Sequence, residues 1–420
     1  MNVDTMRTID KWAGIPLTFM LTIMQRLAAI IRPAKVRPVK RILFIELSEM
    51  GSTILVDPAL QKAKRELGAE LYFLIFHKNS ASLALIGTIA PENIFTLREN
   101  NLVLLLMDTL RFFFWTRKIG VDTVVDLELF SRFTALLSGI SGCCRRVGFY
   151  SFHNEGLYRG ELLTHRVAYN PHIHMAKNFI AMINALAASE DEIPYSKHRV
   201  DDHELVLPRF TCSPDDLEQM RQKIIRRSPN KKIGQRDHFI LINPNASELL
   251  PQRRWMRTRY EALIKKILAH REDVLVLITG APGEREEAEE MCAEISSKRC
   301  VNFAGAVQLI ELPVLYTLSS LMVTNDSGPG HFAAITPLPT FVLFGPETPA
   351  LYGSLGNTTA IFAGLACSPC VSAANHRKTP CTDNKCLQAI TVDQVFEVIR
   401  PVLDGLPVPE SAGGEHKAKE

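Results

Sequence analysis

The sequence lacks the features that mark several common classes of protein. It has no long basic block interleaved with aromatic residues, and a formal net charge of only +3 gives no argument for a nucleic-acid partner. No G-x-G-x-x-G motif follows the first predicted strand, where the chain reads Ser48-Glu-Met-Gly51, so a nicotinamide-dependent dehydrogenase is disfavoured. No cleavable signal peptide is in view, and the 9 cysteines, an odd number, are thinly spread. They indicate a reducing compartment rather than a disulfide framework.

The chain is long enough for two domains. Its 420 residues, 46% hydrophobic and 22% charged, have the composition of a soluble globular protein that buries two cores. Apolar runs alternate with helical patterns twice, which predicts two series of parallel strands with crossover helices. In the first series we expect strands at 41–47, 71–76 and 123–127 and helices at 102–115 and 132–137. In the second we expect strands at 238–244, 273–279, 321–324 and 340–344 and helices at 259–270, 285–295, 309–318 and 392–403.

The predicted fold class is α/β, with two Rossmann-like, doubly wound domains facing each other across a cleft. Ligands of such sheets bind beyond the carboxyl ends of the strands, and pockets favour domain interfaces. The predicted segments are a basic amphipathic N-terminal segment (1–40), an N-terminal Rossmann-like domain (41–200), a linker region (201–237), a C-terminal Rossmann-like domain (238–391), a C-terminal helix (392–406) and a disordered tail (407–420).

Residues 15–31 form an apolar run near the N-terminus. Gln25 and Arg26 interrupt the run, so it does not offer the roughly 20 mostly apolar residues that a spanning helix needs. On a helix, its large apolar side chains share one face, while Thr18, Thr22 and Gln25 share the other. No acidic residue occurs between 10 and 46, whereas basic residues do. This pattern favours a peripheral anchor on an anionic membrane surface. A helix packed on the protein's own core and a spanning segment are the alternatives.

The most informative motif is the run 325–334, Asn-Asp-Ser-Gly-Pro-Gly-His-Phe-Ala-Ala. It follows an apolar strand and precedes a short helix, which Asp326 or Ser327 can cap. Glycines such as Gly328 allow the backbone to approach a ligand closely. N–H groups at a helix start attract a pyrophosphate, and His331 in the first turn would point at the same anion. A tight turn without a ligand is the alternative interpretation.

Three further loops add to this motif. Phe344-Gly-Pro346 leaves the next strand at the same edge of the sheet. Arg253 and Arg254 lie just before a helix, and guanidinium groups match phosphate oxygens bidentately, although a solvated basic surface would look the same. Glu284, in the loop Thr279-Gly-Ala-Pro-Gly-Glu284, suits ribose hydroxyls by analogy with dinucleotide-binding folds. A favourable charge at a helix N-terminus would explain Glu284 equally well.

Together these motifs resemble the bacterial ADP-heptose:lipopolysaccharide heptosyltransferases. The resemblance covers about residues 40–405 and includes the N-terminal runs Ile45-Glu-Leu-Ser-Glu-Met-Gly51 and Asp57-Pro-Ala-Leu60. It implies the GT-B fold and an inverting transfer of heptose from ADP-heptose to a lipopolysaccharide core or a related lipid-linked glycan. It also implies that no metal takes part in catalysis.

The resemblance assigns roles by position. Asp326, Ser327, Gly328 and His331 would hold the donor's pyrophosphate and sugar. Arg253 falls where the family usually has a phosphate-binding lysine, and Glu284 matches the ribose-binding acid. The N-terminal domain would then present the acceptor. Together with the basic N-terminal segment, the resemblance predicts a cytoplasmic protein that is peripheral on the cytoplasmic face of the inner membrane.

The sequence departs from the family at the general base. The family's proposed base is an aspartate directly after the loop glycine, and Ser52 occupies that place here. Candidate replacements are Glu49 in the same loop, Asp57 at the start of the next helix, and Asp126 at the carboxyl end of a strand. We predict Glu49. The departure leaves open a slow or non-catalytic paralogue that binds a nucleotide sugar, or a transferase of a different nucleotide sugar.

A cysteine loop spans residues 367–386. Cys367, Cys370, Cys381 and Cys386 follow the pattern C-x₂-C-x₁₀-C-x₄-C, with His376 between the pairs. Two close cysteine pairs in a short loop are typical of a structural tetrahedral zinc site. Structural zinc, reduced thiols and disulfides are the three interpretations, and no cofactor is expected for catalysis.

Overall fold

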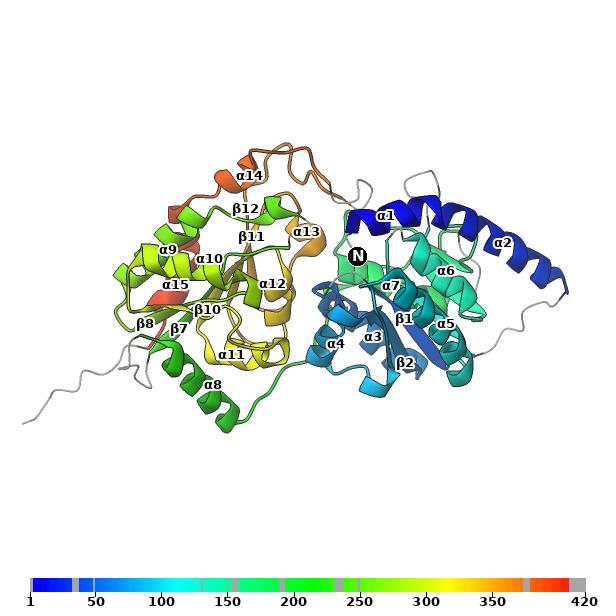
Figure 1. Ribbon diagram of the computed structural model, residues 1–420, viewed down its shortest axis with the longest axis horizontal. Helices are drawn as coiled ribbons and strands as arrows, with labels where there is room; N and C mark the ends of the chain where they lie inside the picture. Colours follow the sequence, from blue (N-terminus) through cyan, green and yellow to red (C-terminus); the bar gives the residue numbers. More distant parts are fainter. Residues whose placement is uncertain are drawn as a thin grey trace, which may run out of the picture. The chain divides into compact units, whose positions relative to one another are not determined.

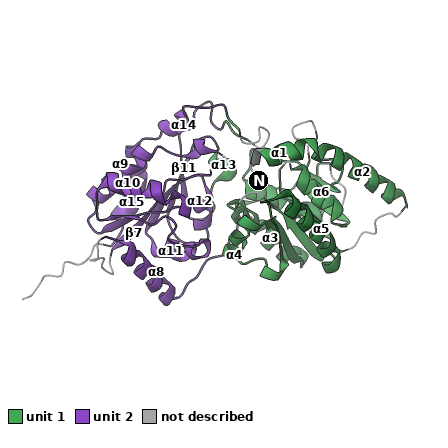
Figure 2. Cartoon of the chain, in the orientation of Figure 1, with its two compact units in different colours: residues 1–208, 347–355, 370–379 green, residues 209–346, 356–369, 380–420 purple. Residues whose placement is uncertain are grey.

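The computed structural model describes residues 3–31, 38–47, 50–129, 131–150, 152, 158–188, 193–229, 237–247, 250–372 and 378–407. The chain folds into two compact units, each built around a parallel sheet of six described strands (Figure 1). Unit 1 comprises residues 1–208, 347–355 and 370–379, and unit 2 comprises residues 209–346, 356–369 and 380–420 (Figure 2). The predicted fold class, α/β with two Rossmann-like domains, is confirmed.

The sheet of unit 1 has the strand order β3-β2-β1-β4-β5-β6. After β1 the chain adds β2 and β3 on one side and then returns to place β4 on the other, so the strand order reverses between β1 and β4. The strands are β1 (Arg41–Ile45), β2 (Glu70–Phe76), β3 (Ile94–Leu97), β4 (Thr123–Asp126), β5 (Arg145–Phe149) and β6 (His165–Val167). The helices are α1 (Val3–Trp12), α2 (Gly14–Ile31), α3 (Ser52–Leu67), η1 (His77–Asn79), α4 (Ala81–Ile86), η2 (Pro91–Asn93), α5 (Leu102–Ile119), α6 (Arg132–Ile140), α7 (Met175–Ala187), η3 (Asp202–Glu204) and α13 (Pro349–Tyr352).

The sheet of unit 2 repeats this topology in the order β12-β11-β10-β7-β8-β9, with its reversal between β7 and β10. The strands are β7 (His238–Asn243), β8 (Val274–Ile278), β9 (Cys300–Asn302), β10 (Leu321–Asn325), β11 (Thr340–Phe344) and β12 (Thr358–Phe362). The helices are α8 (Pro214–Arg227), η4 (Pro251–Arg253), α9 (Arg257–His270), η5 (Pro282–Glu284), α10 (Arg285–Ile295), η6 (Leu309–Glu311), α11 (Leu312–Leu318), α12 (Gly328–Ala333), α14 (Lys385–Gln388) and α15 (Val392–Asp404).

Unit 1 includes a segment that follows unit 2 in the sequence. Residues 347–355, which carry α13, are tied to His174, the residue that caps α7. The Nδ1 atom of His174 accepts from the main-chain N of Ala176 at 3.2 Å, so its Nε2 atom carries the proton and donates to the main-chain O of Gly353 at 2.8 Å. Unit 1 is therefore completed by residues that the chain reaches only after building most of unit 2.

Helix α2 packs on α6 through its polar face (Figure 1). Thr18 and Thr22 are buried, and Thr22 Oγ1 accepts from the main-chain N of Glu161 at 3.0 Å. Gln25 Nε2 donates to the main-chain O of Gly139 at 2.9 Å. A Cβ at Gly139 would lie 2.6 Å from a methyl carbon of Leu21, so a residue without a side chain allows this close approach. The two predicted faces exist, but the polar one faces the protein.

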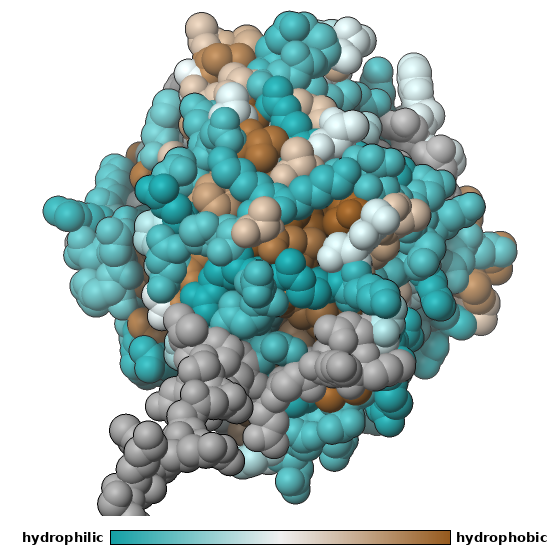
Figure 3. All heavy atoms as spheres, turned by 90° about the vertical axis from the view of Figure 1, so that its left-hand side faces the viewer, coloured by the Kyte–Doolittle hydropathy of each residue, from teal (hydrophilic) through white to brown (hydrophobic). Residues whose placement is uncertain are grey.

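The apolar face of α2 points away from unit 1. Met20, Met24 and Ile30 are 57%, 61% and 79% exposed. Packing of this face on the protein's own core, one of the alternatives from the sequence, is therefore wrong. By length and composition alone, α2 is long and apolar enough to cross a membrane, contrary to the expectation that the run is too short. By contrast, the face of the molecule in Figure 3 is largely hydrophilic, with small scattered hydrophobic patches.

Candidate functional site

The polar residues that the sequence singled out in unit 2 follow the carboxyl ends of β7, β8 and β10. Because β7 and β10 are neighbours and the strand order reverses between them, their following loops diverge and leave room for a ligand. The loop after β8 lies beside the loop after β7, since Asn243 Nδ2 donates to the main-chain O of Thr279 at 3.2 Å. The structure therefore brings these loops to one edge of one sheet.

Asn325, the last residue of β10, fixes these loops with four hydrogen bonds. Its Nδ2 donates to the main-chain O atoms of Pro244, at 2.7 Å, and Asn245, at 3.3 Å. Its Oδ1 accepts from the main-chain N of Trp255 at 3.0 Å and from the hydroxyl of Tyr260 at 2.9 Å. Asn325 is fully buried, and the four bonds satisfy its amide group. The sequence showed this residue in the motif, but only the strand order reveals its role.

Asp326 and Arg253 form an ion pair next to Asn325. Arg253 ends the short helix η4, and its Nε atom lies 3.4 Å from Oδ2 of Asp326. Both side chains are largely buried. Burial raises the pKa of the Asp326 carboxyl, and the Arg253 guanidinium opposes that effect. The pair fixes the position of a guanidinium, a group whose planar fork matches phosphate oxygens. Two predicted donor-binding residues from distant parts of the chain are thus adjacent.

The loop after Asp326 leads into α12. Ser327 occupies the position before the helix, but its hydroxyl donates to the main-chain O of Asn325 at 3.2 Å and does not cap the helix. Since the carboxylate of Asp326 pairs with Arg253, the predicted side-chain cap is wrong. Helix α12 begins at Gly328 and has 6 residues, so its dipole is small, and His331 lies in it almost completely buried. Main-chain N–H groups and His331 remain the polar groups that this turn offers.

Glu284 closes the turn η5 between β8 and α10. Its Oε2 atom accepts from the main-chain N of Ala281 at 2.6 Å, so the helix-start interpretation of Glu284 holds. Its carboxylate is also hydrogen-bonded to the side chain of Asn245, and burial raises its pKa. A Cβ at Gly280 would lie 2.6 Å from Glu284 Oε2, which explains the glycine at that position. Glu284 therefore touches the loop that Asn325 holds.

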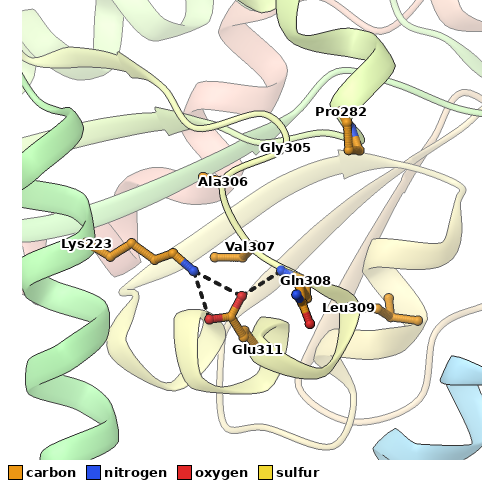
Figure 4. A pocket seen from close by; sticks show the side chains of 8 residues that line it. All are labelled: Lys223, Pro282, Gly305, Ala306, Val307, Gln308, Leu309 and Glu311. Atoms are coloured by element: carbon orange, nitrogen blue, oxygen red, sulfur yellow. Dashed lines mark hydrogen bonds and ion pairs between the residues drawn. The ribbon is translucent and has the colours of Figure 1, made fainter.

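A pocket of about 710 Å³ lies beside this turn (Figure 4). Pro282, the first residue of the Glu284 turn, is one of its walls. At another wall, Lys223 Nζ lies 2.8 and 3.0 Å from the two carboxylate oxygens of Glu311 (Figure 4). The lining residues are Lys223, Pro282, Gly305, Ala306, Val307, Gln308, Leu309 and Glu311. Sequence reasoning missed this pocket because the loop after β9 carries no distinctive motif.

Among the three candidate replacements for the base in unit 1, Asp126 is the one that the structure argues against most directly. Asp126 is fully buried and forms an ion pair with the guanidinium of Arg159. Arg159 in turn donates from Nε to the main-chain O of Ser131 at 2.9 Å and from a terminal nitrogen to Thr134 Oγ1 at 3.2 Å. A carboxylate enclosed in this way cannot reach an acceptor hydroxyl. We assign Asp126 a structural role instead.

The other two candidates, and Ser52 at the family's base position, differ in what surrounds them. Glu49, our preferred base, lies outside the described residues. Asp57 is buried in α3, where its carboxylate accepts from Thr88 Oγ1 and Gln61 Nε2, each at 2.5 Å, and burial raises its pKa to about 6. Ser52 is the first residue of α3 and is partly exposed, and its hydroxyl donates to the carboxylate of Glu46. Sequence reasoning treated Glu46 only as part of a strand.

The described cysteines do not gather into a zinc site. The thiol of Cys381 donates to Asp383 Oδ1 and that of Cys386 to Asn384 Oδ1, both at 3.5 Å. Within the described ranges, no three His, Cys, Asp or Glu side chains are grouped so that they could hold a metal ion. His376 lies outside those ranges. All nine cysteines are described, and none is in a disulfide, so the disulfide interpretation is wrong. Structural zinc at Cys367, Cys370, Cys381 and Cys386 stays a prediction that this arrangement does not support.

Known proteins match this chain in sequence and in fold. The family model "Glycosyltransferase family 9 (heptosyltransferase)" matches residues 163–379. Lipopolysaccharide heptosyltransferase 2 of Salmonella typhimurium is 33% identical over 106 residues, which are 24% of this chain and 30% of that protein. The chain thus spans less than a third of the length of this curated relative.

Solved structures share the fold over most of the chain. E. coli ADP-heptose lps heptosyltransferase II superposes with a TM-score of 0.65 at 19% identity, covering 86% of this chain and 98% of that one. E. coli heptosyltransferase WaaC with ADP-2-deoxy-2-fluoro heptose superposes with a TM-score of 0.59 at 14% identity, covering 86% and 99%. At these identities the likeness establishes the common fold.

Proposed function

The chain belongs to glycosyltransferase family 9, the heptosyltransferase family, and on that premise we propose that it is an inverting glycosyltransferase with ADP-heptose as donor and a lipopolysaccharide core, or a related lipid-linked glycan, as acceptor. The observation that carries the proposal is the buried ion pair of Arg253 and Asp326 beside the Glu284 turn, at the reversal point of the sheet of unit 2. The names of the relatives and the ADP-heptose analogue in the WaaC structure support the choice of donor.

The proposed reaction is a single displacement. The acceptor oxygen attacks the anomeric carbon of the donor, the bond from that carbon to the diphosphate oxygen breaks, and the nucleoside diphosphate leaves with inversion. Arg253, His331 and the main-chain N–H groups from Ser327 to Gly328 stabilise the negative charge that develops on the leaving group. Asp326 holds the guanidinium of Arg253 in place. No step requires a metal ion.

A separate binding site is proposed for the nucleoside of the donor. Glu284 accepts hydrogen bonds from the ribose hydroxyls, because a carboxylate accepts from both hydroxyls of one sugar. The pocket beside it has the apolar side chains of Pro282, Val307 and Leu309 in its wall, which suit the faces of a flat base. The ribose at Glu284 then connects a base in this pocket to a diphosphate at Arg253.

Calorimetric titration tests the donor. We expect ADP-heptose to bind more tightly than UDP- or GDP-sugars, and we expect heptose transfer to a heptose-free lipopolysaccharide core in a radiolabel assay. Preference for another nucleotide sugar would keep the fold and the displacement but replace the donor. Donor binding without transfer would favour a slow or non-catalytic paralogue, and no binding of any nucleotide sugar would refute the proposed function.

We also propose that α2 docks the protein on the cytoplasmic face of the inner membrane, where a lipid-linked acceptor is held. The apolar face of α2 points outward while Thr18, Thr22 and Gln25 hold the helix to unit 1. Such a helix lies in the interface with its apolar side chains among the acyl chains. Lys11 and Arg26 add favourable charge toward anionic lipids. Crossing the bilayer would instead require α2 to leave α6.

The double variant Met20→Glu/Met24→Glu is expected to weaken binding to anionic vesicles by roughly 100-fold in a sedimentation assay. Each methionine contributes about 1.5 kcal/mol when buried in the membrane, and the new charges repel anionic lipid. The matched control is Val206→Glu/Ile310→Glu, which adds the same charge at residues that are 50% and 58% exposed elsewhere. Equal vesicle binding by both double variants would show that α2 is not the docking element.

A further inference from the structure

Glu46 is a buried carboxylate at the reversal point of the sheet of unit 1. It directly follows β1, and its main-chain N donates to the main-chain O of Leu74 in β2 at 3.1 Å, which fixes its backbone. The carboxyl ends of β1 and β4 are neighbours, with Ile45 paired to Asp126. Glu46 is 6% exposed. A buried carboxylate at this place in a doubly wound sheet lies where such folds bind their ligands.

The hydroxyl of Ser52 donates to the carboxylate of Glu46. Ser52 begins the 16-residue helix α3 and is partly exposed, whereas Glu46 is buried behind it. A serine hydroxyl is a weak base by itself. A carboxylate hydrogen-bonded to it can take its proton at the moment that the hydroxyl oxygen accepts another. The pair therefore links a partly exposed oxygen to a buried proton acceptor.

Three neighbouring carboxylates are engaged differently. Asp126 forms an ion pair with Arg159, and Asp57 accepts from the side chains of Gln61 and Thr88. Glu128 accepts from the main-chain N of Leu47 at 2.9 Å. Glu46 is instead bonded to the hydroxyl of Ser52, a partly exposed residue that begins the next helix. Through this contact Glu46 can act on a substrate by way of another residue.

We propose that Ser52 and Glu46 form a proton relay for the acceptor. The inference rests on the proposed glycosyl transfer. As the acceptor oxygen bonds to the anomeric carbon and the diphosphate leaves, the acceptor's hydroxyl proton passes to Ser52 Oγ, and the proton of Ser52 passes to Glu46. Ser52 ends as a neutral hydroxyl and Glu46 as a neutral acid, which later returns its proton to water. Ser52 touches the acceptor, and Glu46 acts through Ser52.

Glu46→Gln is expected to lower kcat by about 10²–10⁴-fold while leaving calorimetric donor affinity unchanged, because the amide cannot take a proton. Ser52→Ala should lower kcat by a similar factor. The double variant Glu46→Gln/Ser52→Ala should be no slower than the slower single variant, because both residues serve one step. Thermal unfolding of each variant separates lost chemistry from lost folding.

The pH dependence of kcat distinguishes a proton relay from a purely structural role of Glu46, because a structural role would not change it. The relay needs Glu46 ionised, so kcat of the wild type should fall at acidic pH, and Glu46→Gln should remove that fall from its residual rate. Other titratable groups near this end of β1 are Asp57 on α3, Asp126 at the end of β4, Glu128 after β4, and His77 and Lys78 after β2. Glu128→Gln is therefore the matched control, and we expect it to keep the acidic limb.

Rescue completes the test. Adding Ser52→Asp to Glu46→Gln places a carboxylate directly at the partly exposed position, and we expect at least a 10-fold recovery of kcat. Normal kcat in both single variants, or an unchanged acidic limb in Glu46→Gln, would overturn the relay while wild-type transfer from ADP-heptose upholds the proposed function. A wild type that binds no nucleotide sugar would overturn both.

Discussion

Replacing Asp326 by alanine is expected to weaken ADP-heptose binding at least 100-fold and to lower turnover by orders of magnitude. The carboxylate of Asp326 lies 3.4 Å from the guanidinium of Arg253, and its loss frees that guanidinium to leave the diphosphate position. Removing one partner of a buried pair also leaves the other charge poorly compensated. Calorimetry gives the affinity, a transfer assay gives kcat, and thermal unfolding checks that the fold is retained.

Two further variants separate charge from geometry at this pair. Arg253→Lys keeps the positive charge but loses the planar fork, so we expect an intermediate loss of affinity. The matched control is Asp273→Ala, which removes the partner of Arg271 in an ion pair of 2.5 Å at the amino end of β8. Asp273→Ala should leave donor affinity unchanged. Near-normal turnover in Asp326→Ala would remove this loop from the active site.

Replacing Asp126 by alanine is expected to lower the free energy of unfolding by about 3–5 kcal/mol, because it leaves Arg159 buried without its carboxylate. Urea unfolding followed by circular dichroism measures the change. Any loss of turnover should follow the loss of folded protein, since we assign Asp126 no part in the chemistry.

The control for this variant replaces both partners. Asp126→Leu/Arg159→Met removes both charges at once, and an apolar pair of similar volume is expected to recover most of the lost stability. A folded Asp126→Ala protein with normal stability and abolished turnover would contradict the structural assignment. It would return Asp126 to the list of candidate bases.

The sequence predicted the central strands better than the edges of the sheets. Buried strands such as β7 and β8 are continuous apolar runs, and this pattern is readable from one sequence. The edge strand β6 begins with His165 and Arg166, and the edge strand β12 is only half-buried, so neither has that pattern. Edge strands carry polar residues because one side of them meets solvent. Their strand character depends on a neighbour that lies far away in the sequence.

The candidate site shows the same limit. The resemblance to a family identified Arg253, Glu284 and Asp326 one at a time, but nothing in the sequence pairs Arg253 with a residue 73 positions later. The sequence analysis did not single out Glu46, because a carboxylate at the end of a predicted strand has no sequence pattern that marks it as functional. Periodicity correctly predicted that α2 has a polar face and an apolar face. It does not indicate which of the two faces packs on the protein.

The division into units has a consequence for genetic dissection. The chain returns to unit 1 twice after entering unit 2, at residues 347–355 and 370–379, and the first of these segments is bonded to His174 of α7. A gene truncated after codon 208 would therefore encode unit 1 without α13, and one starting at codon 209 would carry α13 without its own unit. An exchange of halves between two homologues by a single crossover would mismatch these segments. A chimera that respects the fold must exchange three stretches of the gene together.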